Sequence, residues 1–156
     1  RVDRMLNPSI QESHLPPFLT PDSGVRSGYM IAQYTAAALV NECRAEGRTA
    51  TDSTPVSGGQ EDHVSMSATA AFATRRTLDR ARRVVAIELL CAAQAAEFVS
   101  GLAHGVGTGA VYDAVRAVVE PLDADRPSHT DVDALAEVVA DGRLDSALFD
   151  TVDDLE

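Results

Sequence analysis

Four polar residues that could contact a ligand follow one another, directly after two glycines and directly before a long run rich in alanine and valine. They are Gln60, Glu61, Asp62 and His63. Ligand sites place a few such polar groups at chosen positions in otherwise apolar surroundings. The sequence therefore leaves two functions open for this quartet, which are to face a ligand or to cap a helix.

The capping interpretation explains part of the quartet. Ser57 and Gln60 have the spacing of a capping box, in which each side chain binds a free amide of a helix's first turn. Glu61 and Asp62 would then lie in that first turn, where the helix dipole favours negative charge. Capping needs neither a second carboxylate nor His63, so a role in ligand binding stays open.

Other motifs indicate little chemistry. The four histidines are far apart and have no paired spacing, so no metal site is expected. The stretch "VSGLAHG" contains Ser100 and Gly101 but follows a helical pattern, which favours a helix end over an active-site loop. Cys43 and Cys91 lie in apolar stretches without CxxC spacing, and we expect them to be small buried side chains in a reducing cytoplasm.

The composition indicates one acidic, helix-rich domain. The 156 residues are 45% hydrophobic but only 4% aromatic, so the core must be built from small aliphatic side chains. The net charge of −11 argues against nucleic acid and anionic membranes as partners, because both attract basic proteins. All 13 cationic residues are arginine, a composition typical of a halophilic, high-salt cytoplasm or of a GC-rich genome. No signal peptide is recognisable, so a cytoplasmic location is expected.

Proline, glycine and apolar spacing predict the elements. Residues 1–22 are rich in proline and are expected to be irregular. One helix is predicted from residues 22–27 to Gly47, and a second of about 40 residues, or about 60 Å, from the quartet to Glu97. Over residues 99–156 the pattern predicts short helices that are separated by breaks containing glycine or proline.

The second predicted helix is apolar around most of its circumference over residues 84–98. A helix of this kind must be buried. It is also too long for a compact domain of this size, whose radius of gyration would be about 15 Å. We therefore expect other subunits, or polypeptide outside this chain, to cover it. The apolar run is shorter than the roughly 20 residues that a bilayer requires.

Four blocks of sequence carry a family resemblance: "LPPFL", "SGYMIAQYTAAALVNE", "QEDHVSM" and "RRVVAIELLCAAQAAEF". Together they closely resemble the C-terminal half of the histidine ammonia-lyases, a branch of the aromatic amino acid ammonia-lyase family. The match is tight over residues 13–98 and looser from there to the end.

The resemblance implies an all-α fold, a long-helix bundle that assembles as a homotetramer with active sites built from more than one subunit. Residues 1–156 would be the C-terminal portion of a single larger helical lyase domain. Within it, residues 1–22 would be irregular, residues 23–98 would form the core long helices, and residues 99–156 would form peripheral short helices.

The resemblance also implies a reaction, the non-oxidative removal of ammonia from L-histidine to give trans-urocanate. The family's electrophile is a methylidene-imidazolone group (MIO) that forms from an internal Ala-Ser-Gly. That tripeptide is absent from the 156 residues. The group would therefore come from polypeptide outside this chain, and the chain alone is not expected to catalyse.

In the family's Q-E-D-H motif the glutamate lies in the active site near the substrate imidazole, and that position is Glu61 here. Gln60 is a further candidate for lining the same pocket, whereas His63 is expected to be structural. Relatives that act on aromatic amino acids tend to carry glutamine at the position of Glu61, so the glutamate favours histidine. The family usually has asparagine before this motif, where this chain has Gly59, which puts a hydrogen bond of that asparagine in doubt.

Two other functions stay open at this stage. One is an ammonia-lyase or aminomutase that acts on phenylalanine or tyrosine. The other is a non-catalytic helical module that mediates oligomerisation.

Overall fold

The computed structural model describes residues 1–10, 14–48, 50–51, 53–99, 101 and 103–152. Within these residues every regular element is helical, which confirms the predicted all-α class. The α-helices are α1 (Val2–Leu6), α2 (Met30–Ala45), α3 (Ser67–Glu97), α4 (Val106–Arg116), α5 (His129–Ala140) and α6 (Arg143–Phe149), and two 3-10 turns are η1 (Pro17–Leu19) and η2 (Ser57–Gly59).

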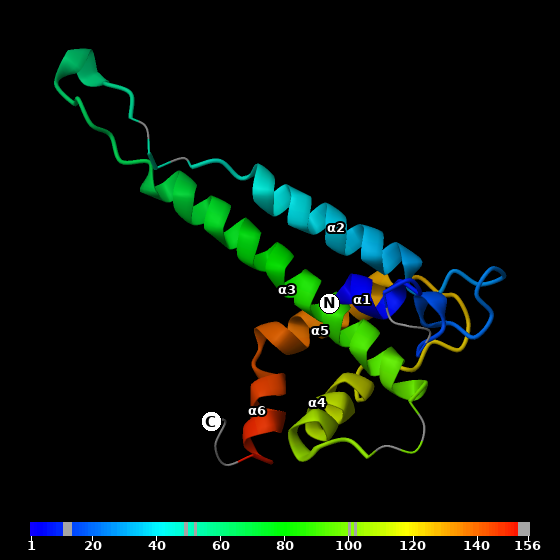
Figure 1. Cartoon of the computed structure of the whole chain (residues 1–156). Helices are drawn as coiled ribbons and strands as arrows, with labels where there is room; N and C mark the ends of the chain where they lie inside the picture. Colours follow the sequence, from blue (N-terminus) through cyan, green and yellow to red (C-terminus); the bar gives the residue numbers. More distant parts are fainter. Residues whose placement is uncertain (11–13, 49, 52, 100, 102, 153–156) are drawn as a thin grey trace.

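The chain forms a body with a long arm (Figure 1). The arm consists of α2 and the first half of α3, which run side by side in opposite directions. The second half of α3 continues into the body, where it contacts α1, α4 and α5. Helix α6 closes the body by contacts with α4 and α5. No helix of the described part is long and apolar enough to cross a membrane.

Helix α3 is long because no proline or glycine interrupts its sequence. Its 31 residues make it about 46 Å long at 1.5 Å per residue. The predicted start at the quartet was wrong, since α3 begins only at Ser67. The reason lies in Gly58 and Gly59, whose φ angles of 62° and 86° put them in the left-handed region, so they form a turn instead of a helix start.

Helix α2 also begins later than predicted, at Met30 instead of residues 22–27. Gly28 has a φ of 52°, and the amide of Tyr29 donates to the carbonyl of Phe18 at 3.0 Å. The amides of Ser27 and Gly28 donate to the carboxylate of Asp125 at 2.8 and 2.9 Å. These amides are thus committed to tertiary contacts before the helix starts.

The core lies where the second half of α3 meets the body. Ile87, Leu90 and Cys91 of α3 are completely buried, together with Leu6 of α1 and Leu135 of α5. The expectation that this chain alone could not bury residues 84–98 was therefore wrong for one face of that segment, where the chain itself buries Ala86, Ile87, Leu90, Cys91, Ala93 and Gln94, whereas Val85 and Ala92 stay exposed. The helix α1 within residues 1–22 was not predicted either, since the proline-rich pattern of that segment begins only after it.

Candidate functional site

The quartet lies at the far end of the arm, in the loop of residues 46–66 between α2 and α3 (Figure 1). Its backbone forms a closed turn. The amide of Val56 donates to the carbonyl of Glu61 at 2.9 Å, and the amide of Glu61 donates back to the carbonyl of Val56 at 3.3 Å. The glycine pair reverses the chain between them, so the backbone position of Glu61 is set by this turn.

A second pair of hydrogen bonds joins the two sides of the loop, closer to the helices. The amide of Val64 donates to the hydroxyl oxygen of Ser53 at 2.7 Å, and that hydroxyl donates to the carbonyl of Val64 at 3.2 Å. Ser53 and Val64 are both half-buried in an otherwise exposed loop. We refer to this pair as the Ser53–Val64 clip.

The four side chains of the quartet are all exposed. Among the described residues, no hydrogen bond or ion pair involves the side chain of Gln60, Glu61, Asp62 or His63. The interpretation of Glu61 and Asp62 as residues of a helix's first turn was wrong, because α3 begins six residues after Glu61. The four residues of the quartet lie together because they are consecutive in the sequence, not because folding assembles them. Their polar groups are free to bind something outside this chain.

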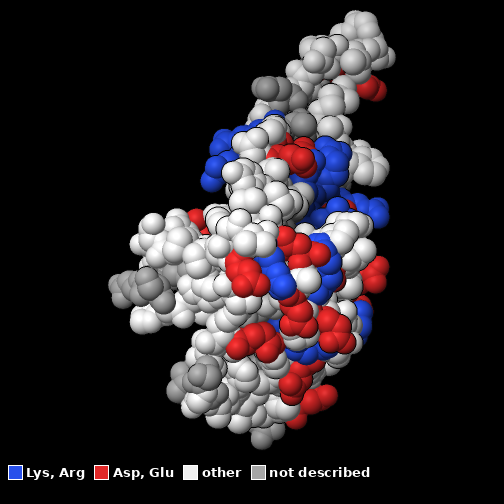
Figure 2. All heavy atoms as spheres, turned by 90° about the vertical axis from the view of Figure 1, so that its right-hand side faces the viewer, with Lys and Arg blue, Asp and Glu red and all other residues white. Residues whose placement is uncertain are grey.

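A cluster of charged residues joins the two helices where the loop leaves them. Arg80 of α3 binds Glu42 at 2.8 Å and Glu46 at 2.6 Å, both carried by the last part of α2 and its cap. Arg76 binds both carboxylate oxygens of Glu46 at 3.1 Å. In Figure 2 the arginines of the arm lie beside acidic side chains, below a tip that shows no arginine on that face.

These contacts shift the ionisation of the residues involved. Hydrogen bonds from Arg76 and Arg80 lower the pKa of the Glu46 carboxyl to about 2. The same bonds raise the pKa of both guanidinium groups. The sequence analysis missed this cluster. A signal was present, since two glutamates and two arginines each recur at a spacing of four residues on neighbouring helices.

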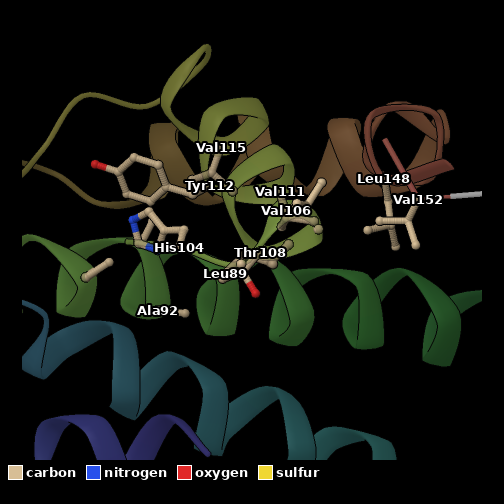
Figure 3. Close-up of a pocket in the computed structure, with 14 residues that line it drawn as sticks. Leu89, Ala92, His104, Val106, Thr108, Val111, Tyr112, Val115, Leu148 and Val152 are labelled. Atoms are coloured by element: carbon tan, nitrogen blue, oxygen red, sulfur yellow. The ribbon is translucent and has the colours of Figure 1, made fainter. Parts of the chain in front are cut away.

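A cavity lies in the body of the chain (Figure 3). It measures about 610 Å³ and lies between α3, α4 and α6. The rings of His104 and Tyr112 stack at one side, with centroids 4.9 Å apart. The remaining lining is almost entirely aliphatic or glycine: Leu89, Ala92, Ala93, Ala96, Gly105, Val106, Gly107, Thr108, Val111, Val115, Leu148 and Val152.

The ionisable side chains of this lining are His104 and Tyr112, and the Tyr112 hydroxyl already donates to Glu97 at 2.5 Å, so the cavity is a weaker candidate than the quartet. The stretch "VSGLAHG" borders it, but Ser100 and Leu102 of that stretch lie outside the described residues. Among the described residues, no group of three or more histidine, cysteine, aspartate or glutamate side chains is arranged to hold a metal ion.

The sequence profile of the aromatic amino acid lyase family matches residues 1–117. The chain belongs to this family. A probable histidine ammonia-lyase of Halobacterium salinarum is 51% identical over 154 residues, which are 98% of this chain and 29% of the relative. A histidine ammonia-lyase of Symbiobacterium thermophilum is 50% identical over 149 residues, which are 95% of this chain and 29% of the relative.

Solved structures of the family have the same fold as this lyase chain. Histidine ammonia-lyase from Trypanosoma cruzi matches with a TM-score of 0.90 and 35% identity, over 97% of this chain and 30% of that one. Tyrosine aminomutase from Streptomyces globisporus matches with a TM-score of 0.93 and 35% identity, over 99% and 30%. These matches confirm the predicted ammonia-lyase fold. The lyase chain spans about 29% of the length of the curated relatives it matches.

Proposed function

We propose that this lyase chain is part of a histidine ammonia-lyase, which converts L-histidine to trans-urocanate and ammonia. The observation that carries the proposal is Glu61 within the motif Q-E-D-H, in a chain about half identical to relatives named histidine ammonia-lyase. We further propose that residues 1–156 correspond to the C-terminal part of the enzyme, with core long helices over 23–98 and peripheral helices over 99–156.

The proposed role of Glu61 is to bind the imidazole of the substrate. A carboxylate can accept a hydrogen bond from an imidazole N–H or pair with an imidazolium ion, and it can assist proton movement. The exposed Glu61 side chain, which none of the described residues binds, is available for such a contact. Gln60 is proposed to line the same pocket through its amide, whereas His63 is proposed to have a structural role.

The MIO group of the family cannot form from this chain's own residues. Serine precedes glycine at four places, and the residues before these pairs are Asp22, Arg26, Val56 and Val99, none of which is alanine. We therefore propose that polypeptide outside the 156 residues supplies the group. When present, MIO supplies the electrophile of the reaction. The contribution of this chain is to bind and orient the imidazole end of the substrate.

A homotetramer is proposed as the working form. Several large apolar side chains on the α2–α3 arm are exposed within this chain, and a bundle with other copies would cover them: Ile31, Tyr34, Phe72, Leu78 and Val85. The acidic, lysine-free composition supports a halophilic enzyme, and a relative from Halobacterium is consistent with it. The free thiols of Cys43 and Cys91 support a cytoplasmic location, and no nucleic acid or membrane partner is proposed.

The test uses the full-length enzyme that contains this chain. Incubation with L-histidine should produce the near-ultraviolet absorbance of urocanate. The substitution Glu61→Gln should lower turnover by a factor of about 10² or more, the usual scale for an acid–base group. Glu120→Gln removes an equal charge from an exposed position in the body and should leave turnover unchanged. Full activity of the Glu61→Gln enzyme would refute the role of Glu61.

The similarity to tyrosine aminomutase keeps one alternative substrate class open, because its structure matches as well as that of the histidine enzyme. Assays with histidine, phenylalanine and tyrosine separate the two. Turnover of tyrosine without turnover of histidine would replace the proposed function by an aromatic amino acid lyase or aminomutase.

A further inference from the structure

The outer half of the arm contains little apolar packing. In α2 the buried residues are Ala32 and Ala36, and in α3 only Ala73 is buried before Ala86. A buried alanine contributes a single methyl group, worth about 0.8 kcal/mol. Within this chain, contacts other than a hydrophobic core must therefore hold the end of α2 against α3 at the point where the loop begins.

The cluster of charged residues where the loop leaves the helices provides these contacts. Arg80 reaches two carboxylates at once, with Nε 2.8 Å from Glu42 Oε2 and Nη1 2.6 Å from Glu46 Oε1. The Arg80 and Glu46 side chains are 22% and 20% exposed, so this pair is more shielded than most ion pairs of the chain. We call Glu42, Glu46, Arg76 and Arg80 the arginine clamp.

The position of Glu46 makes the clamp necessary. Glu46 caps the C-terminus of α2, where the helix dipole disfavours negative charge, and it lies four residues after Glu42, which repels it. The guanidinium groups of Arg76 and Arg80 offset both effects. Without Arg80, Arg76 would still bind Glu46, but the bridge that joins Glu42 and Glu46 to α3 through one guanidinium group would be lost.

The clamp stands at the root of the loop that carries Glu61. Glu46 is the first residue after α2. The Ser53–Val64 clip follows farther out, and the Val56–Glu61 turn lies at the tip. The clamp, the clip and the turn thus follow one another along the loop toward Glu61, and none of the three is a hydrophobic core.

We propose that Arg80 is a positioning residue for the reaction, because its bridge between Glu42 and Glu46 fixes the loop that presents Glu61 to the substrate. The proposal rests on the proposed function of Glu61. Arg80 touches neither substrate nor MIO in this role. It raises the fraction of molecules in which the loop has the conformation that binds substrate.

The kinetic signature follows from this fraction. When only a fraction of the enzyme molecules can bind substrate, the apparent dissociation constant equals the intrinsic constant divided by that fraction. Once substrate is bound, it holds the loop in place. Arg80→Ala in the full-length enzyme should therefore raise KM for histidine about tenfold, with kcat changed by less than about twofold. Partial unfolding would lower kcat at constant KM, and loss of a catalytic group would also lower kcat.

Three further variants keep the test sharp. Arg80→Lys retains the charge but lacks the fork that reaches two carboxylates, so its KM should lie between those of wild type and Arg80→Ala. Arg76→Ala keeps the Arg80 bridge and should raise KM less than Arg80→Ala does. Arg82 pairs with Asp79 on the same helix at 3.1 Å with both side chains about half exposed, so Arg82→Ala should change nothing.

Hydrogen exchange tests the clamp without using activity. In Arg80→Ala, the amides of Glu61 and Val64 should exchange faster, whereas those of Ile87 and Leu90 in the core should keep their wild-type rates. Unchanged KM and unchanged exchange would overturn the proposal, as would a loss of kcat at constant KM. If the wild-type enzyme fails to deaminate histidine, the proposed function is refuted. Hydrogen exchange still tests the clamp separately, because unchanged exchange in Arg80→Ala would show that the clamp does not hold the loop.

Discussion

The side chain of Gln94 binds the backbone of Leu122 twice, although 28 residues separate them along the chain. Its amide nitrogen donates to the Leu122 carbonyl at 3.3 Å, and its carbonyl oxygen accepts from the Leu122 amide at 2.9 Å. Both residues are buried, at 3% and 6% exposure. The Leu122 backbone is buried but belongs to no helix or sheet, and the Gln94 side chain satisfies both its amide and its carbonyl. This contact holds the segment after α4 against α3.

Replacement of Gln94 by methionine should lower the free energy of unfolding. Met fills a similar volume but satisfies neither backbone group, and a buried polar group without a partner costs about 1–3 kcal/mol. Urea unfolding of wild type and Gln94→Met measures the difference. Gln33→Met is the matched control, since Gln33 binds Asp3 at 2.8 Å in an exposed pair, and it should cost less than about 0.5 kcal/mol. Equal losses in both variants would contradict this assignment.

The sequence predicted those parts of the fold that depend on local rules. The absence of proline and glycine predicted the uninterrupted course of α3, and Gly47 correctly marked the end of α2. The apolar run of residues 84–98 predicted burial but not what buries it. Its partners α1 and α5 are distant in sequence, and nothing in the run itself identifies them.

The predictions for the site failed where tertiary structure decides the backbone. Ser57 and Gln60 have capping spacing, yet Gly58 between them turns the chain before any helix begins. The role that we propose for Glu61 depends on groups outside this chain, and the local pattern alone could not distinguish it from a cap. The arginine clamp depends on which faces of α2 and α3 meet, so charge spacing indicated its members but not their pairing.

Gly28 should tolerate no side chain. Its φ is 52°, and a Cβ atom there would lie 2.3 Å from the carbonyl oxygen of Phe18, a backbone atom that cannot move aside easily. Gly28→Ala should therefore destabilise the protein by more than about 1 kcal/mol, measured by chemical unfolding.

Gly47→Ala is the control for this change. Gly47 has open space around its Cβ position and no positive φ, so alanine should be neutral or stabilising by up to about 1 kcal/mol. A neutral effect at both glycines would show that the contact between Gly28 and Phe18 is not needed for the start of α2.

The two thiols should differ in reactivity. Burial, with a smaller effect of Glu88, raises the pKa of the Cys91 thiol to about 12. Because the thiolate is the reactive form, Cys91 should stay unmodified by a disulfide reagent at pH 8 in the folded protein. Cys43 is half-buried beside a surface groove and should react. Cys43→Ser should abolish the reaction in the native protein, whereas Cys91→Ala should retain it; fast labelling of Cys43→Ser would contradict this prediction.

Acid should release the arginine clamp. The pKa of Glu46 is lowered in the folded protein from 4.5 to about 2, first by its hydrogen bond with Arg76 and then by that with Arg80. A depressed carboxyl pKa stabilises the fold above the unfolded value, and this contribution disappears as the pH falls from about 4.5 to about 2. A double-mutant cycle of Glu46→Gln and Arg80→Ala, followed by urea unfolding, should show a coupling energy at pH 6 that is mostly lost at pH 2. Coupling that is as large at pH 2 as at pH 6 would mean that Glu46 remains fully ionised there or that its contact with Arg80 is not electrostatic. Absence of coupling at pH 6 would mean that solvent screens the pair completely, in which case Arg80 could not hold the loop.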